Sequence, residues 1–308
     1  MSSTCRLQQA AGIAVFVLFI TGCSGGGGDT DTMSPAAPEP VSIRVDGVGF
    51  STPESVLHDE AADLYLVSNI NGSPTDKDGN GFISRVAPDG SLAELKWIDG
   101  EAPGVTLHAP KGMAIANGNL YVADIDCLRS FDQVSGEPTG EICVDGATFL
   151  NDVAAALDGS ILFTDSGLDP SFAPSGADAV YRLDGTEVLT VLANPNLGAP
   201  NGIVDTNDGI LVVTFMSGEV FRIRPSVAPT PIVAPSEMQL DGIVVLPNDR
   251  VLMSSWGDSC VHELTASGEA QCIISDVAAP ADIGADAGRN RVLIPLFNDN
   301  AVLIQTIP

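Results

Sequence analysis

A short phrase recurs six times along the chain: a loop, a dipeptide of small or polar residues, an apolar residue, and then an apolar strand. The second residue of each copy falls at position 54, 111, 151, 201, 241 or 281, so three of the five steps are 40 residues long. A period near forty residues is typical of a four-stranded sheet repeated around an axis. One such sheet cannot bury its own apolar faces, so the copies must pack against one another.

The repeat predicts an all-β fold, a six-bladed β-propeller over residues 41–308. Each copy of the phrase precedes an apolar run, and several of these runs are apolar on both faces, as expected for strands between neighbouring blades. The chain ends on the third strand of the sixth blade. We expect Val41–Val48, which alternates like a strand, to supply the missing fourth strand and close the ring.

The N-terminal 40 residues have a different composition. Ala11–Ile20 is an apolar run too short to span a membrane comfortably. Ile20-Thr21-Gly22-Cys23 follows it and resembles a bacterial lipobox, which implies a lipoprotein signal peptide over residues 1–22 and lipidation of Cys23; an ordinary secretory signal is the alternative. Residues 23–40 then form a flexible Gly-, Ser-, Asp- and Pro-rich tether. This predicts a periplasmic lipoprotein of a bacterial cell envelope, anchored in the outer membrane through its lipid alone.

The remaining cysteines suit an exported protein. Cys127 and Cys143 lie on either side of one predicted turn, and Cys260 and Cys272 lie on either side of another. Cross-strand partners in a hairpin have this arrangement, so we predict disulfides Cys127–Cys143 and Cys260–Cys272. Four buried free thiols are the alternative.

The formal net charge is −27, from 40 acidic and 13 basic residues. This charge disfavours nucleic acid and anionic membrane surfaces as partners. We expect a monomer that acts on a small-molecule substrate.

Equivalent positions of the repeat converge on the axis of the ring. Four of them carry oxygen-bearing side chains: Glu54, Asn151, Asn201 and Asp241. Hard oxygen ligands suit Ca²⁺ or Mg²⁺, and two carboxylates match one divalent charge. The absence of Cys and His at these positions disfavours zinc. The alternative is turn chemistry, because Asn-Gly and Asp-Gly are common turn dipeptides.

Other residues near the axis have two interpretations each. Lys111 occupies the same position in the second blade, where it binds a substrate anion or pairs with Glu54 or Asp124. His108 is a candidate base at the same mouth, and Asp124 lines the channel or caps a turn. We take Lys111, His108 and Asp124 as candidate substrate-binding residues. Asp76–Gly81 matches the first half of an EF-hand loop but lacks its closing Glu and its helices, which favours a hairpin turn.

Some of these motifs resemble a known family. They are Pro53-Glu54, Leu150-Asn151-Asp152-Val153 followed by Asp158-Gly159 and Thr164-Asp165-Ser166-Gly167, Pro200-Asn201-Gly202-Ile203 and Leu240-Asp241-Gly242-Ile243. Over Val41–Pro308 the chain is similar to calcium-dependent six-bladed propellers that include gluconolactonase, senescence marker protein, diisopropyl fluorophosphatase and paraoxonase. The resemblance implies that Glu54, Asn151, Asn201 and Asp241 hold a catalytic metal, Ca²⁺ first, with Mg²⁺ and Mn²⁺ as alternatives.

The sequence thus favours a lipid-anchored, metal-dependent hydrolase of lactones or esters. Asp241 and Glu54 are the candidate catalytic carboxylates, and Asp241 would activate water or attack the carbonyl itself. Two other functional hypotheses remain. One is a non-catalytic envelope propeller that binds a ligand or a protein, and the other is an enzyme of another class, such as a strictosidine synthase-like or lyase-like protein.

Overall fold

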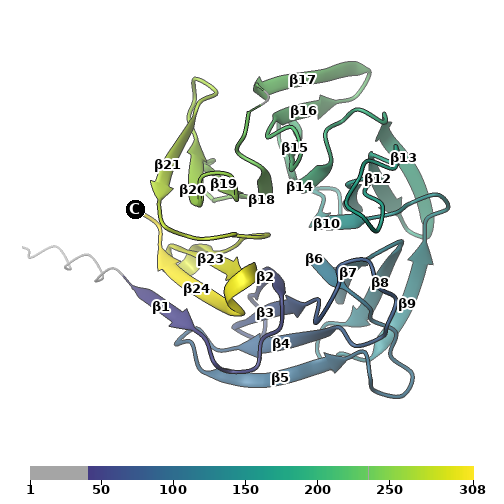
Figure 1. The fold of residues 1–308 in the computed structure, drawn as a ribbon, viewed down its shortest axis with the longest axis vertical. Helices are drawn as coiled ribbons and strands as arrows, with labels where there is room; N and C mark the ends of the chain where they lie inside the picture. Colours follow the sequence, from purple (N-terminus) through teal and green to yellow (C-terminus); the bar gives the residue numbers. More distant parts are fainter. Residues whose placement is uncertain (1–40, 235) are drawn as a thin grey trace, which may run out of the picture. The chain divides into compact units, whose positions relative to one another are not determined.

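The computed structural model describes residues 41–234 and 236–308. The lipobox, Cys23 and the tether lie outside these residues. The described chain forms six four-stranded antiparallel sheets, arranged as blades around a central axis (Figure 1). The fold is therefore the all-β, six-bladed β-propeller that the forty-residue repeat predicts.

Each blade runs from an innermost strand at the axis to an outermost strand at the rim. The first blade consists of β2 (Pro53–Asp59), β3 (Leu64–Asn69), β4 (Phe82–Val86) and β5 (Leu92–Asp99). The second consists of β6 (Pro110–Ala116), β7 (Asn119–Asp124), β8 (Cys127–Asp132) and β9 (Pro138–Cys143). The third consists of β10 (Leu150–Ala155), β11 (Ile161–Asp165), β12 (Ala179–Asp184) and β13 (Glu187–Ala193). The next two are β14 (Pro200–Thr206), β15 (Gly209–Thr214), β16 (Val220–Arg224) and β17 (Val227–Val233); and β18 (Leu240–Val245), β19 (Val251–Ser255), β20 (Cys260–Leu264) and β21 (Ala270–Ile274).

The sixth blade combines strands from both ends of the described chain. Its order is β22 (Gly284–Asp286), β23 (Arg291–Leu296), β24 (Ala301–Thr306) and β1 (Ser42–Val45). β1 pairs antiparallel with β24, with Val45 opposite Val302 and Ser42 opposite Gln305. Segments at opposite ends of the described sequence therefore share one sheet.

The core lies between the blades. Six of the clusters of buried apolar side chains each combine residues of two neighbouring sheets. Between the first two blades, for example, Leu66 and Ile83 pack with Leu120 and Phe131. Because both faces of each blade are covered, the second strands are almost fully buried, as in Ile161–Asp165 of β11. This explains why their sequences lack the alternation of a half-exposed strand.

Helical structure in the described residues is limited to two 3-10 turns, Ala287–Arg289 and Phe297–Asp299. None of the helices in the described residues has the length and apolarity needed to cross a membrane. Disulfides join Cys127 to Cys143 and Cys260 to Cys272. Each ties the third strand of its blade to the fourth.

Candidate metal centre and its cavity

The predicted metal ligands lie at the start of the innermost strands, where each strand contains a β-bulge. In β10, Leu150 pairs with Asp165 and Val153 pairs with Phe163, so Asn151 and Asp152 share a single opposite residue. The same shift occurs after Pro200 in β14 and after Leu240 in β18, and a one-residue shift in β2 leaves Glu54 unpaired. A bulge changes the direction of a side chain, and here it turns one side chain of each blade toward the axis.

The glycines that follow two of the ligands have a packing role. A Cβ on Gly202 would lie 2.5 Å from the carbonyl oxygen of Asp241, and a Cβ on Gly242 would lie 2.4 Å from the backbone nitrogen of Ile283. Both residues lie within strands, β14 and β18. Asn201-Gly202 and Asp241-Gly242 are therefore not turn dipeptides, and glycine is needed because the backbone of the next blade packs directly against it.

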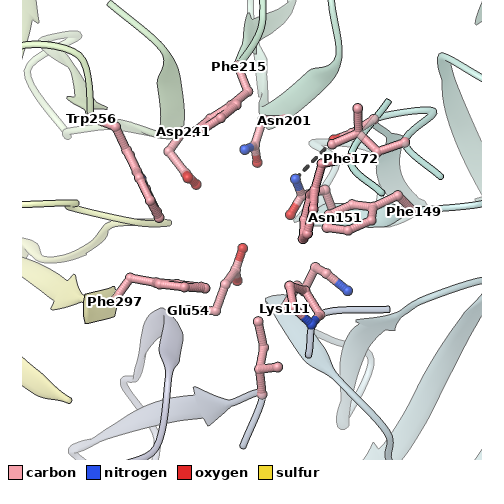
Figure 2. Close-up of a pocket in the computed structure, with 14 residues that line it drawn as sticks. Glu54, Lys111, Phe149, Asn151, Phe172, Asn201, Phe215, Asp241, Trp256 and Phe297 are labelled. Carbon is pink, nitrogen blue, oxygen red and sulfur yellow. Dashed lines mark hydrogen bonds between the residues drawn. The ribbon is translucent and has the colours of Figure 1, made fainter. Parts of the chain in front are cut away.

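The structure brings the four predicted ligands together at the floor of one cavity. Figure 2 shows the side-chain oxygens of Glu54, Asn151, Asn201 and Asp241 turned toward a common central space. All four residues are at most 5% exposed. They line a cavity of about 100 Å³ that opens at one mouth of the channel.

One oxygen of each of these side chains lacks a hydrogen-bond partner. Ten buried side-chain atoms in the described residues are unpartnered, and four of them are Glu54 Oε2, Asn151 Oδ1, Asn201 Oδ1 and Asp241 Oδ1. Buried polar atoms are nearly always paired, so four such atoms facing one space need a common partner. Two carboxylate and two amide oxygens form a donor set that fits a hard divalent cation.

The electrostatics of the site also call for a cation. Burial, followed by repulsion from Asp241 and Asp282, raises the pKa of Glu54 well above its usual value. Burial and then repulsion from Asp282 raise the pKa of Asp241 in the same direction. Two buried carboxylates cannot both hold their charges at neutral pH without a positive partner, which a divalent ion would provide.

Ser166 fixes the direction of the Asn151 amide. Asn151 Nδ2 donates a hydrogen bond to Ser166 Oγ at 2.9 Å (Figure 2), and Ser166 Oγ donates to the carbonyl of Pro200 at 2.6 Å. The hydroxyl thus holds the amide nitrogen away from the axis and leaves Oδ1 facing the cavity. It also links the third blade to the fourth.

Lys111 occupies the position in the second blade that is equivalent to those of the four oxygen donors, but its ammonium group points away from the central oxygens (Figure 2). Nζ donates to the carbonyl of Ala109 at 3.1 Å and lies 4.4 Å from the centroid of the Phe149 ring. The expected ion pair with Glu54 or Asp124 is not formed among the described residues. Burial lowers the pKa of Lys111 to about 8, against the opposing influence of Glu54 and Asp124.

His108 and Asp124 do not line the cavity. Asp124 accepts hydrogen bonds from the backbone nitrogens of His108 and Ala109 and pairs with Arg129 at 2.9 Å. His108 Nδ1 accepts from the backbone nitrogen of Gly79 at 3.0 Å. These contacts hold the loop before β6 in place. In the Asp76–Gly81 segment, Asp78 accepts hydrogen bonds from Asn80, which closes a tight turn.

Sequence reasoning missed the aromatic wall of the cavity. Phe149, Phe172, Phe215, Trp256 and Phe297 line it, and their rings surround the four oxygens in Figure 2. A repeat signal marks three of them: the residue directly after the second strand is Ile70, Ile125, Ser166, Phe215, Trp256 or Phe297 in blades one to six. We call this set the collar position; it is apolar in every blade except the third.

Comparisons with known proteins agree with this architecture. The sequence matches no protein-family model and no curated protein at a significant level. Among solved structures, a gluconolactonase from Xanthomonas campestris is 19% identical, with a TM-score of 0.66 over 84% of this chain and 87% of that one. The calcium-binding protein regucalcin from Agrobacterium tumefaciens is 16% identical, with a TM-score of 0.58 over 86% and 93%. Virginiamycin B lyase from Staphylococcus aureus is 16% identical, with a TM-score of 0.59 over 88% and 100%.

At 16–19% identity, these similarities concern the fold. Structures described as a gluconolactonase, a calcium-binding protein and a lyase all match, so the likeness establishes the fold and leaves the activity to be argued from the site. The donor set at the axis is the feature of this propeller from which that argument starts.

Proposed function

We propose that this chain is a divalent-metal-dependent hydrolase of lactones or esters. The observation that carries the proposal is the set of four buried, unpartnered oxygens at the floor of the cavity. Glu54, Asn151, Asn201 and Asp241 would hold the cation, Ca²⁺ before Mg²⁺ or Mn²⁺. When bound, such an ion supplies a Lewis acid that polarises a substrate carbonyl.

The chain's own residues have three tasks in this proposal. Asp241 accepts a proton from water at a carboxylate oxygen that is not occupied by the cation, as a general base. Ser166 keeps the Asn151 oxygen aimed at the axis. The aromatic wall excludes bulk water from the reacting carbonyl, which strengthens electrostatic interactions inside the cavity.

Calorimetry and a substrate panel test the proposal together. Demetallated full-length protein is titrated with calcium, magnesium and manganese, and hydrolysis of lactones and esters is measured with and without a chelator. We expect one bound ion and chelator-sensitive hydrolysis, both lost when Asn201→Ala and Asp241→Ala are combined. Asp249→Asn, an exposed turn residue, is the matched control and should change neither. Hydrolysis that survives both the chelator and the double substitution would rule out the proposed mechanism.

We also propose that the protein is held in the bacterial cell envelope by a lipid on Cys23. The support is the lipobox-like Ile20-Thr21-Gly22-Cys23 and the polar tether that follows it. The expected result is that the wild-type protein partitions into the detergent phase and Cys23→Ser stays in the aqueous phase. Detergent partitioning of Cys23→Ser would overturn the anchor without affecting the proposed activity.

A further inference from the structure

The cavity above the metal centre is lined by apolar groups. Beyond the four donors and Lys111, its walls are formed by aromatic and aliphatic side chains, together with Ser166. Three members of the collar position form a continuous aromatic arc over blades four to six. The ring centroids of Phe215 and Trp256 are 5.5 Å apart, and those of Trp256 and Phe297 are 5.1 Å apart. The first pair packs edge to face and the second is tilted, and both arrangements are ones that aromatic rings favour over a face-to-face stack.

The opposite wall extends the arc to the mouth of the cavity. Phe149 is buried and packs edge-on against Phe172, with centroids 6.2 Å apart. Phe172 is 47% exposed, so its ring reaches the solvent at the rim. A ligand that leaves the cavity at this point therefore passes over aromatic surface before it reaches water.

Few groups in the walls can hydrogen-bond to a ligand. The Ser166 hydroxyl already donates to Pro200 and accepts from Asn151. Lys111 Nζ uses one of its three N–H donors on the carbonyl of Ala109 and lies against the Phe149 ring. The indole nitrogen of Trp256 has no hydrogen bond of good geometry, but it lies close enough to the Asp241 carboxylate to lower the pKa of that group. This donor therefore faces the carboxylate, and the walls offer few hydrogen-bonding groups to the rest of a ligand.

A polyhydroxylated ring does not fit this lining. Each hydroxyl that leaves water without gaining a partner is penalised, and the penalties of several hydroxyls add up. The size of the cavity points the same way. An apolar cavity of about 150 Å³ holds benzene, so the cavity of about 100 Å³ here has room for an ester group or for part of a small ring, and the remainder of a substrate lies along the collar toward the mouth.

We propose that the site selects apolar lactones or esters, with a small ring or ester group at the metal centre and an alkyl or aryl substituent against the aromatic collar, and discriminates against sugar lactones. This inference rests on the proposed hydrolase function and names its substrate class. In the reaction, water adds to the carbonyl carbon, the carbon–oxygen bond to the leaving oxygen breaks, and that oxygen takes a proton. A lactone then yields one hydroxy acid.

The first test compares kcat/KM of the calcium-loaded full chain for δ-valerolactone, δ-decalactone and glucono-δ-lactone. Burying methylenes against the collar should raise kcat/KM for δ-decalactone at least roughly 20-fold over δ-valerolactone. Glucono-δ-lactone should be at least about 100-fold poorer than δ-decalactone, because its hydroxyls find no partners. Equal or better hydrolysis of glucono-δ-lactone would overturn the substrate class and leave the hydrolase function standing.

A collar substitution tests whether the aromatic arc causes the preference. Phe215→Ser should lower kcat/KM for δ-decalactone at least about fivefold more than for δ-valerolactone, because the longer substrate loses more apolar contact. Val134→Ser is the matched control, since Val134 is 81% exposed and lies outside the cavity. A Phe215→Ser variant that lowers both values equally would overturn the collar's role. Calcium titration of the variant checks that its fold and metal centre are intact.

A binding measurement separates the two proposals. The chain has two tryptophans, and Trp97 stacks on Arg85 outside the cavity. In a Trp97→Phe background, a non-hydrolysable alkyl δ-lactam should change the fluorescence of Trp256, and a hydroxylated lactam at the same concentration should not. Lactam binding without hydrolysis of any panel member would overturn the hydrolase function alone. A response to the hydroxylated lactam but not to the alkyl one would overturn the substrate class.

Discussion

At the scale of single residues, the candidate metal centre depends on the position of each oxygen donor in the ring of blades. Asn151, Asn201 and Asp241 come from the consecutive blades three, four and five, whereas Glu54 comes from blade one, between Lys111 of blade two and Ala281 of blade six. Figure 2 shows Glu54 reaching the central space from the opposite side. The isolated donor is also the longest of the four. We infer that its extra methylene is what brings its carboxylate to the shared space.

Two substitutions at Glu54 separate reach from charge. Glu54→Asp keeps the charge but shortens the side chain, and Glu54→Gln keeps the length but removes the charge. We expect both to weaken calcium binding at least about tenfold, which corresponds to roughly 1.4 kcal/mol. Only Glu54→Gln should raise the melting temperature of the metal-free protein, because it removes a buried repulsion with Asp241. Calorimetry and thermal unfolding measure the two effects, and wild-type affinity in Glu54→Asp would contradict the argument from reach.

The sequence predicted the donors because the repeat makes six positions equivalent. It could not decide between metal binding and turn chemistry for Asn201-Gly202, since both use the same dipeptide. The bulge in β14 and the close packing of Gly202 against Asp241, which are long-range features, show that this dipeptide lies in a strand and not in a turn. The collar position could have been predicted from the same repeat, because it directly follows the second strand of each blade. It was missed because an apolar residue at a strand end looks the same whether it enters the core or lines a cavity.

At the scale of elements, side-chain hydroxyls join neighbouring blades at the level of the donors. Thr164 of β11 is fully buried; its Oγ1 accepts a hydrogen bond from the backbone nitrogen of Asp152 at 3.0 Å and donates to the carbonyl of Asn201 at 2.7 Å. Ser254 of β19 makes the equivalent pair of bonds with Gly242 and Ala281. These hydroxyls hold the bulges of successive inner strands in register.

Thr164→Val should therefore disturb both stability and metal binding. Valine has the same shape but leaves the nitrogen of Asp152 and the carbonyl of Asn201 unpartnered, at an expected loss of about 1–3 kcal/mol in the free energy of unfolding. Calcium affinity should fall as well, because Asn201 loses its anchor. Thr164→Ser keeps the hydroxyl and serves as the control. Urea unfolding and calcium titration give the two quantities, and an unchanged Thr164→Val would show that the hydroxyl is dispensable.

The interface between the sixth and first blades contains a buried polar network. Tyr65 of β3 donates through its hydroxyl to Asp286 Oδ2 at 2.7 Å, and Arg289 pairs with the same carboxylate at 2.9 Å. Burial opposes ionisation of Asp286, but the hydrogen bonds from Tyr65 and Arg289 outweigh it and lower the pKa of Asp286. Burial, and then this same bond, raise the pKa of Tyr65 to about 12.

The lowered pKa predicts an acid-sensitive contribution to stability. A carboxylate whose pKa is lower in the folded state stabilises the fold above its unfolded pKa, about 4, and this contribution is lost as the pH falls through the folded value. Tyr65→Phe should therefore cost about 1–3 kcal/mol at pH 7, and the difference from wild type should shrink as the pH is lowered below 4. Urea unfolding at several pH values measures it. Tyr121→Phe, a half-buried tyrosine, is the control, and a pH-independent cost at Tyr65 would contradict the assignment.

At the scale of the whole molecule, the 308-residue chain carries a formal net charge of −27, most of it on the propeller. Self-repulsion destabilises a compact state, and salt screens it, with a Debye length that falls from about 30 Å at 0.01 M to about 10 Å at 0.1 M. The melting temperature of the metal-free protein should therefore rise by several degrees between low salt and about 0.5 M sodium chloride. Choline chloride should give the same rise, because screening requires no specific site. A flat or falling melting temperature would contradict the role of net charge.

The overall architecture was the most predictable level. A repeat of about forty residues indicates a four-stranded blade, and its six copies predict six blades. The blades form one ring because each copy must cover the faces of its neighbours. Individual strand limits were less predictable. The weak outer strands, such as Glu187–Ala193 of β13, are largely exposed and carry little hydrophobic pattern, and the bulges arise from contacts between blades that no local pattern records.

The bulge at the start of five of the six inner strands holds its side chain in place without depending on which side chain it is. β6 presents Lys111 from the same irregularity from which β10 presents Asn151. Scaffold and chemistry are therefore separable in this molecule. Substituting a few residues at these axial positions would change which ligand the propeller binds. The six apolar cores between neighbouring blades, which hold the ring together, would be unaffected.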